Sequence, residues 1–189
     1  NKDYSFSFGF WKRVQSILKK KKIKFEFEGF EKENVDWVRF SEFFVGEERD
    51  FQRHAILAYL QDRIGIIKIP TRGGKTYVTA EIIRLLNEEN KDNISLFTVD
   101  NLDLFRQSIR DIAKILKKKE GEIGVIQGDN FFPKQITVAM IQTIQSALSR
   151  KGGNSLQRRR GKEFESYLSS VNTQIIDEVQ EFGASVERR

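Results

Sequence analysis

The chain has 189 residues, enough for one α/β domain and a small additional module. It contains no cysteine and one histidine, which excludes a disulfide framework, thiolate chemistry and a zinc site built from Cys and His. Lys and Arg number 33 against 27 Asp and Glu, and the resulting net charge of +6 suits a polyanionic partner without identifying one. No apolar run approaches the roughly 20 residues that span a bilayer, and no signal segment opens the chain. The absence of cysteine fits a reducing cytosol, and we expect a cytoplasmic protein.

The first 46 residues are rich in Phe, Trp and Lys. Residues 4–8 alternate apolar and polar positions as a strand does, residues 11–22 carry apolar positions at helical spacing, and residues 23–28 alternate again. Such a strand–helix–strand unit is too small to hold a core alone. We therefore interpret residues 1–46 as part of a small N-terminal α+β accessory module and residues 47–189 as the main domain.

From residue 47 onward, strand patterns alternate with helical patterns. Strands are predicted at residues 64–69, 94–99, 122–127, 135–139 and 173–177. Helices are predicted at residues 76–86, 102–116, 140–148 and 162–168, with a loop at 150–161. This order implies an α/β fold in which helices flank a parallel sheet with right-handed crossovers, and ligands of such sheets bind at the carboxyl ends of the strands.

The most informative segment is residues 66–76, IIKIPTRGGKT, an apolar strand followed by a turn of small residues that ends in Lys-Thr. Small residues let backbone N–H groups close around a polyphosphate, and a following helix directs its positive dipole end at the same anion. Lys75 would reach the β- and γ-phosphates, and the Thr76 hydroxyl would hold Mg²⁺. Because Ile69 occupies the first Gly position, the strict G-x-x-x-x-G-K-[ST] pattern is not met, and a plain strand–helix connection is the alternative.

A second segment, residues 173–178 (TQIIDE), is an apolar strand that ends in two carboxylates. Most Asp-Glu pairs of this kind are solvated or cap a helix. Here the order is informative, because Pro70 and Asp177 both follow predicted strands of one parallel sheet and would meet at the same edge. Together the two segments predict a nucleotide hydrolase.

Taken in order, these segments resemble the first RecA-like domain of superfamily-2 DNA helicases, and within that group the phage UvsW-type branch-migration helicases. The resembling segments are residues 49–55 (Q motif), 69–76 (motif I), 99–107 (motif Ia), 136–145 (a strand–Thr–Gln segment) and 177–184 (motif II). The resemblance implies a P-loop fold, ATP and Mg²⁺ as cofactors, and branched or forked DNA as a partner bound without regard to sequence. It also implies ATP hydrolysis coupled to unwinding or branch migration in replication, recombination or repair, in the host cytoplasm if the chain comes from a phage.

The resemblance also implies roles for single residues. The nucleotide would be bound by Gln52, which reads the adenine edge, and by Pro70, Thr71, Arg72, Gly73, Gly74, Lys75 and Thr76. The catalytic set would be Lys75, Asp177 and Glu178, with Glu178 as the general base and with Thr76 and Asp177 holding the metal. DNA phosphates would be contacted near Asn101, Gln142 and Thr143.

The chain departs from the family pattern in three ways. Arg72 stands where most relatives have Gly, and Gln180 replaces the His or Asp of motif II. Nothing resembles the Ser-Ala-Thr motif or the second RecA-like domain with its arginine fingers, so we expect a piece of a longer protein. An arginine finger contributes about 10³- to 10⁵-fold in rate, so the chain alone should bind nucleotide and hydrolyse it slowly.

Two other functions remain open. A translocase subunit of a restriction or remodelling assembly shares these motifs without separating strands. A DNA-binding module with a degenerate ATP site would explain Arg72 and Gln180.

Three further features have alternative interpretations. The basic runs at residues 19–22, 117–119 and 158–160 are either solvated helix ends or nucleic-acid contacts. Phe131 and Phe132 could stack on bases, but a local hydrophobic cluster is the favoured interpretation. His54 is interpreted as a structural or surface residue. The N-terminal unit is also similar in pattern to the small DNA-binding module of the UvsW-type helicases.

Overall fold

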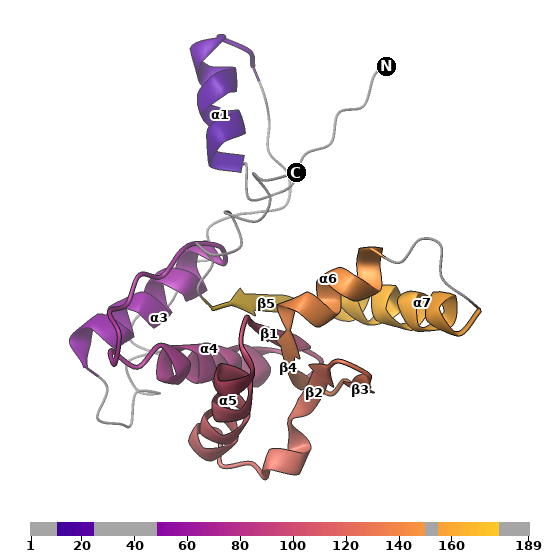
Figure 1. Ribbon diagram of the computed structural model, residues 1–189. Coiled ribbons are helices and arrows are strands. Elements are labelled where there is room, and N and C mark those ends of the chain that lie inside the picture. The colour runs from indigo at the N-terminus through magenta and orange to yellow at the C-terminus, as the bar shows by residue number, and fades with distance from the viewer. Residues whose placement is uncertain (1–10, 25–48, 150–154, 178–189) are drawn as a thin grey trace. The chain divides into compact units, whose positions relative to one another are not determined.

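The structure is a computed structural model that describes residues 11–24, 49–149 and 155–177 (Figure 1). The chain divides into two compact parts, one ending at Lys68 and one beginning at Ile69, and each is described by itself. None of the helices within the described residues has both the length and the apolar character that a membrane span requires.

The first part contributes two helices. Helix α1 (Trp11–Lys20) confirms the helical prediction and ends in Lys19 and Lys20, where cations favour the helix C-terminus. Residues 23 and 24 lie outside any strand, while the predicted strand at 4–8 and the rest of 23–28 fall outside the described residues.

Helix α3 (Asp50–Asp62) buries Gln52, Ile56 and Leu60 at steps of four residues. The spacing of these three side chains places them on one face. His54 is exposed on this helix, as its surface interpretation predicted.

The predicted strand at residues 64–69 is wrong. These residues form no strand, and the side chain of Ile66 is 82% exposed. A strand requires a neighbour that accepts and donates ladder hydrogen bonds, and the five described strands of the sheet pair only with one another. A run of apolar residues therefore does not define a strand without such a neighbour.

The second part is built on a five-stranded sheet in the order β3-β2-β4-β1-β5. Its strands are β1 (Ser95–Val99), β2 (Gly124–Gln127), β3 (Asn130–Phe132), β4 (Ile136–Met140) and β5 (Thr173–Ile176). Strand β1 runs parallel to β4 and β5, and β2 runs parallel to β4, which confirms the parallel sheet. Strand β1, which lies between β4 and β5, is buried along its whole length, as expected for a strand covered on both faces.

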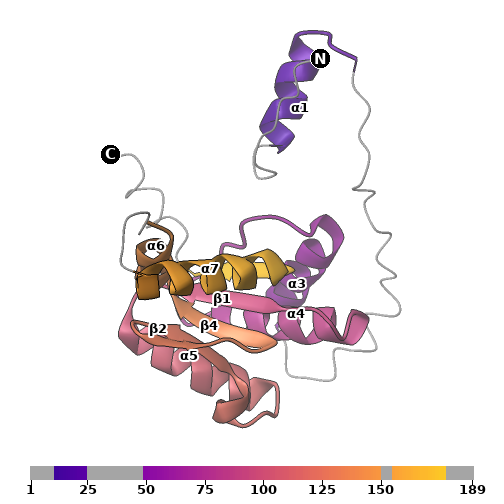
Figure 2. The same cartoon turned by 90° about the vertical axis from the view of Figure 1, so that its right-hand side faces the viewer.

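Helices cover both faces of the sheet (Figures 1 and 2). Helices α4 (Lys75–Glu89) and α5 (Leu102–Ile115) pack over a core cluster that includes Ile83, Phe97, Val99, Ile112 and Val138. Helices α6 (Ile141–Ser149) and α7 (Ser155–Ser170) pack over a cluster that includes Leu96, Ile126, Ala139, Ile144 and Phe164. Neighbouring residues of one strand enter opposite clusters because side chains alternate across a strand.

Helix α7 starts earlier than predicted, since residues 155–160 are helical and not part of a loop. This stretch contains three arginines, which are good helix formers, and Gly161 is tolerated inside the helix at a modest cost. Residues 150–154 of the predicted loop fall outside the described residues.

Strand β3, which was not predicted, pairs antiparallel with β2 after a turn in which Gly128 has a φ of 58°. Its Phe131 ring lies 5.0 Å from the Phe164 ring and 6.1 Å from the Tyr167 ring of α7. The hydrophobic-cluster interpretation is therefore right for Phe131, whereas Phe132 on the same strand is 61% exposed.

Candidate functional site

The segment between Ile69 and α4 forms a tight turn. The Gly73 N–H donates a 2.9 Å hydrogen bond to the Pro70 carbonyl, which makes Thr71 and Arg72 the two central residues of the turn. Arg72 has a φ of 63° and Thr71 does not have a positive φ, the pattern of a type II turn, in which Gly or Asn is favoured at the second central position. An arginine in this left-handed region costs roughly 1–2 kcal/mol relative to glycine.

The two glycines after the turn have separate structural reasons. A Cβ on Gly73 would lie 2.5 Å from Cγ2 of Ile69 and 2.9 Å from the Pro70 carbonyl oxygen, so only glycine fits. Gly74 is the N-cap of α4 with a φ of 85°, and its carbonyl accepts the first helical hydrogen bond from Val78 at 3.0 Å. Helix α4 therefore begins at Lys75, with the positive end of its dipole at this turn.

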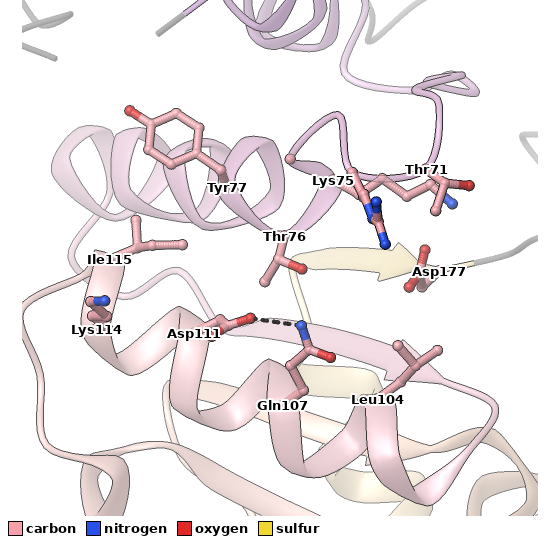
Figure 3. A pocket seen from close by; sticks show the side chains of 12 residues that line it. Thr71, Lys75, Thr76, Tyr77, Leu104, Gln107, Asp111, Lys114, Ile115 and Asp177 are labelled. Carbon is pink, nitrogen blue, oxygen red and sulfur yellow. Dashed lines mark hydrogen bonds between the residues drawn. The ribbon is translucent and has the colours of Figure 1, made fainter. Parts of the chain in front are cut away.

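The turn, the start of α4 and α5 line an open pocket of about 750 Å³ (Figure 3). Its lining residues are Thr71, Arg72, Gly74, Lys75, Thr76 and Tyr77 from the turn and α4, Leu104, Gln107, Asp111, Lys114 and Ile115 from α5, and Asp177. This volume is within the range of small-molecule and cofactor sites.

Asp177 reaches this pocket from the carboxyl end of β5. Its N–H donates a 2.9 Å hydrogen bond to the Thr98 carbonyl, which extends the β1–β5 ladder by one residue. Lys75, Thr76 and Asp177 therefore line one pocket although about 100 residues separate Thr76 from Asp177 in the sequence. Asp177 lies at the carboxyl edge expected from a parallel sheet, whereas the turn that precedes Lys75 and Thr76 follows no strand.

Pro70 and Gly73 shape the turn without lining the pocket. Glu178 and Gln180 lie outside the described residues. Gln52 belongs to the first part of the chain; it is buried, and its side-chain oxygen accepts a 3.1 Å hydrogen bond from the Arg49 N–H at the start of α3. The roles assigned to these residues stay predictions.

The sequence interpretation missed the wall of the pocket that α5 provides. On this helix the Gln107 amide donates a 3.2 Å hydrogen bond to Asp111, and Lys114 and Ile115 follow one turn later (Figure 3). Polar residues four positions apart on one helix face were a usable signal. That α5 faces α4 and the turn could be known only from the packing.

Helix α4 contains a partly buried group of ion pairs between residues of its own successive turns. Arg84 contacts the buried Glu81 at 2.7 Å and Glu88 at 2.8 Å. Burial acts to lower the pKa of Arg84, but the hydrogen bonds and charges of Glu81 and Glu88 outweigh it, so the pKa is raised and the side chain stays charged.

Of the three residues predicted to lie near DNA, Asn101 follows β1, and Gln142 and Thr143 follow β4 in the first turn of α6. Asn101 caps α5 by accepting a 2.9 Å hydrogen bond from the Leu104 N–H. The Gln142 amide donates to the Asp100 carbonyl at 2.6 Å, and the Thr143 hydroxyl oxygen accepts from the Gly128 N–H at 3.0 Å. These bonds connect neighbouring loops into one edge.

A buried polar network lies at the opposite, amino end of the sheet and was also missed. The Asn93 amide donates to the buried Ser95 hydroxyl at 2.9 Å, and beside this network the Ile94 N–H donates to the exposed side chain of Asn172 at 2.9 Å. The Thr173 hydroxyl donates to the Asn93 side chain, so the network joins the start of β1 to the start of β5. Thr173 lies four residues before Asp177 on the same strand segment.

Comparison with known proteins places these features in a family. Residues 45–188 match the family described as the res subunit of type III restriction enzymes. Over 104 residues the chain is 35% identical to the DNA 3'-5' translocase XPB2 of Sulfurisphaera tokodaii, a match that covers 55% of the chain and 21% of that protein. The chain thus spans about a fifth of the length of this curated relative.

Solved structures show the same fold. The UvsW helicase of bacteriophage T4 matches with a TM-score of 0.60 at 17% identity, covering 89% of this chain and 78% of that one. A second structure, of T4 UvsW, matches with a TM-score of 0.59 at 16% identity and covers 92% of this chain and 41% of that one. Because the family match covers most of the chain, the chain belongs to the family of the type III restriction enzyme res subunit, and it has the RecA-like fold of the superfamily-2 helicases that it resembles.

Proposed function

We propose that the chain binds Mg²⁺·ATP in the pocket between the turn, α4 and α5, as the nucleotide-binding half of a DNA helicase. The observation that carries this proposal is the meeting of Lys75, Thr76 and Asp177 in one pocket. A cation, a hydroxyl and a carboxylate are the groups that a metal-bound triphosphate requires. The pocket also lies at the carboxyl ends of the strands, where ligands of such sheets bind.

Each residue has a separate task in this proposal. Lys75 neutralises phosphate charge, and the backbone between Pro70 and Thr76 surrounds the phosphates. The hydroxyl of Thr76 and the carboxylate of Asp177 are oxygen donors of the kind that Mg²⁺ prefers, and the bound ion would offset phosphate charge. Glu178 orients the attacking water and accepts its proton.

The adenine contact is proposed for Gln52. A side-chain amide can donate one hydrogen bond to the base and accept another, which suits the adenine edge. The bond from the Arg49 N–H to the side-chain oxygen of Gln52 fixes the orientation of this amide at the start of α3.

DNA is proposed to run along the edge formed by Asn101, which precedes α5, and by Gln142 and Thr143 in the first turn of α6. Phosphate contacts from such loops contain no sequence information, so binding should be indifferent to sequence and should weaken steeply with salt. A flat salt dependence would argue against this part of the proposal.

For the organisation of the parent protein, we propose an accessory DNA-binding module at residues 1–46, a motor domain from residue 47 onward, and a second RecA-like domain elsewhere. The parent would use ATP hydrolysis to unwind or migrate branched DNA in replication, recombination or repair. A double-strand translocase is the second candidate, supported by the name of the Sulfurisphaera tokodaii relative, which is a DNA translocase.

The first test is binding of Mg²⁺·ADP to this chain, measured by titration calorimetry with Lys75→Ala as the matched variant. Binding by the natural sequence that is lost in the variant supports the pocket assignment. If the natural sequence does not bind at millimolar Mg²⁺·ADP, the nucleotide site is degenerate and a DNA-binding module is the better assignment.

The second test is ATP turnover by the parent protein with no DNA, single strand, linear duplex or a four-way junction. Preference for the junction supports branch migration, whereas equal stimulation by linear duplex supports the translocase. In the same assay, Glu178→Gln should retain nucleotide binding and stop hydrolysis, and unchanged turnover would remove Glu178 as the base.

A further inference from the structure

We propose that Arg72 supplies a second cation to the nucleotide phosphates from the same turn that precedes Lys75. This inference rests on the proposed function, because it assigns a ligand contact within the nucleotide pocket. It concerns a position at which the chain departs from the family pattern.

The placement of Arg72 is the first argument. Arg72 lines the same pocket as Lys75, Thr76 and Asp177. It is exposed, and within residues 11–24, 49–149 and 155–177 no hydrogen bond or ion pair of its guanidinium is found. A cation at the wall of this pocket is available to an anionic ligand.

The backbone of the turn gives no local reason for an arginine. Arg72 occupies the second central position of the turn closed by the Gly73 N–H and the Pro70 carbonyl, with a φ of 63°. Glycine and asparagine adopt this left-handed conformation with less strain than arginine. The side chain therefore requires an explanation outside the turn, and the adjacent pocket provides one.

The chemistry of the two cations is complementary. The ammonium of Lys75 is a compact point charge, whereas a guanidinium presents a planar fork of N–H donors that matches two phosphate oxygens. A second cation also adds most to the binding of ligands with several phosphates. The pocket should therefore discriminate between nucleoside di- or triphosphates and monophosphates more strongly with Arg72 than without it.

The experiment compares Arg72→Asn, Arg72→Lys and Arg72→Gly with the natural chain. Asparagine tolerates the left-handed backbone and removes only the charge, glycine removes both charge and strain, and lysine retains a charge without the planar fork. Affinities for Mg²⁺·ADP and for AMP are measured by titration calorimetry at several salt concentrations, and circular dichroism confirms folding.

We expect Arg72→Asn and Arg72→Gly to weaken Mg²⁺·ADP binding by about tenfold, the scale of one charge-assisted hydrogen bond at an exposed site. AMP binding should change much less, lysine should restore part of the loss, and the salt dependence of ADP binding should become shallower in both uncharged variants.

Three results would overturn the inference. The first is an unchanged ADP affinity in Arg72→Asn. The second is a loss of ADP affinity in Arg72→Gly alone, which would indicate an effect of the shape of the turn. The third is an equal loss of affinity for ADP and for AMP. The two proposals can fail separately. If the natural chain binds Mg²⁺·ADP, Lys75→Ala does not, and Arg72→Asn binds as tightly as the natural chain, then only the role of Arg72 is removed. If the natural chain binds no nucleotide, both proposals fall.

Discussion

The hydroxyl of Thr173 donates a 2.9 Å hydrogen bond to the side-chain oxygen of Asn93, and both residues are only 5% exposed. This bond joins the first residue of β5 to the segment before β1, at the end of the sheet opposite Asp177. In the part of the chain that the structure describes, β5 pairs with β1 alone. The buried hydrogen bond therefore adds a second attachment to β5, which otherwise pairs only with β1.

Thr173→Val should destabilise the fold by about 1–3 kcal/mol, because it leaves the buried oxygen of Asn93 without this donor. Chemical denaturation measures the change in the free energy of unfolding. Gln174→Val is the matched control, since the neighbouring side chain is exposed and its replacement should cost about 0.5 kcal/mol or less. Equal stability of the two variants would show that the Asn93 contact contributes nothing.

Gly73→Ala should abolish or strongly reduce nucleotide binding. The added Cβ would overlap the Pro70 carbonyl oxygen and the Ile69 side chain, so the turn must open and displace the start of α4. Gly65→Ala is the control, because a Cβ there meets nothing within 4 Å. Calorimetric titration with Mg²⁺·ADP compares the two variants. If Gly73→Ala binds Mg²⁺·ADP as tightly as the natural chain, the turn can accommodate the added Cβ.

Gln142→Ala should weaken the stimulation of ATP turnover by DNA in the parent protein while leaving nucleotide binding unchanged. The variant removes the bond to the Asp100 carbonyl that ties the start of α6 to the loop between β1 and α5. Gln145→Ala, at an exposed position of the same helix, should have no effect. If both variants respond to DNA as the natural protein does, this edge does not bind DNA.

Tyr167→Phe should alter the pH dependence of stability in alkaline solution. Burial raises the pKa of Tyr167 above its usual value of 10.0, because the charged phenolate is disfavoured in the folded state. The stabilisation is present below pH 10 and is lost as pH rises through the folded pKa. The natural chain should therefore lose stability above pH 10 more steeply than Tyr167→Phe, as measured by denaturation at pH 8 and at stepwise higher pH. Parallel profiles would contradict the role of burial.

Local patterns predicted most of the second part of the fold. The apolar stripe of α5 and the apolar run of β1 each depend on residues close in sequence, so their periodicity is visible without the fold. The paired carboxylate and phosphate-loop segments were recognisable for the same reason. Strand β3 escaped prediction because three residues give too little periodicity, and residues 64–69 were wrong because pairing requires a partner that sequence alone does not specify.

By itself the sequence determined the residue types and spacing of the nucleotide segment, the alternation of strands and helices from residue 94 onward, and the place of Asp177 at the carboxyl edge of the sheet. Only the tertiary structure decided what surrounds them: the α5 wall with Gln107 and Asp111, the left-handed backbone of Arg72, and the bonds that engage Gln142 and Thr143. The physical reason is range. Periodicity and turn chemistry act over a few neighbouring residues, whereas pockets and cross-loop hydrogen bonds arise only when distant segments pack together.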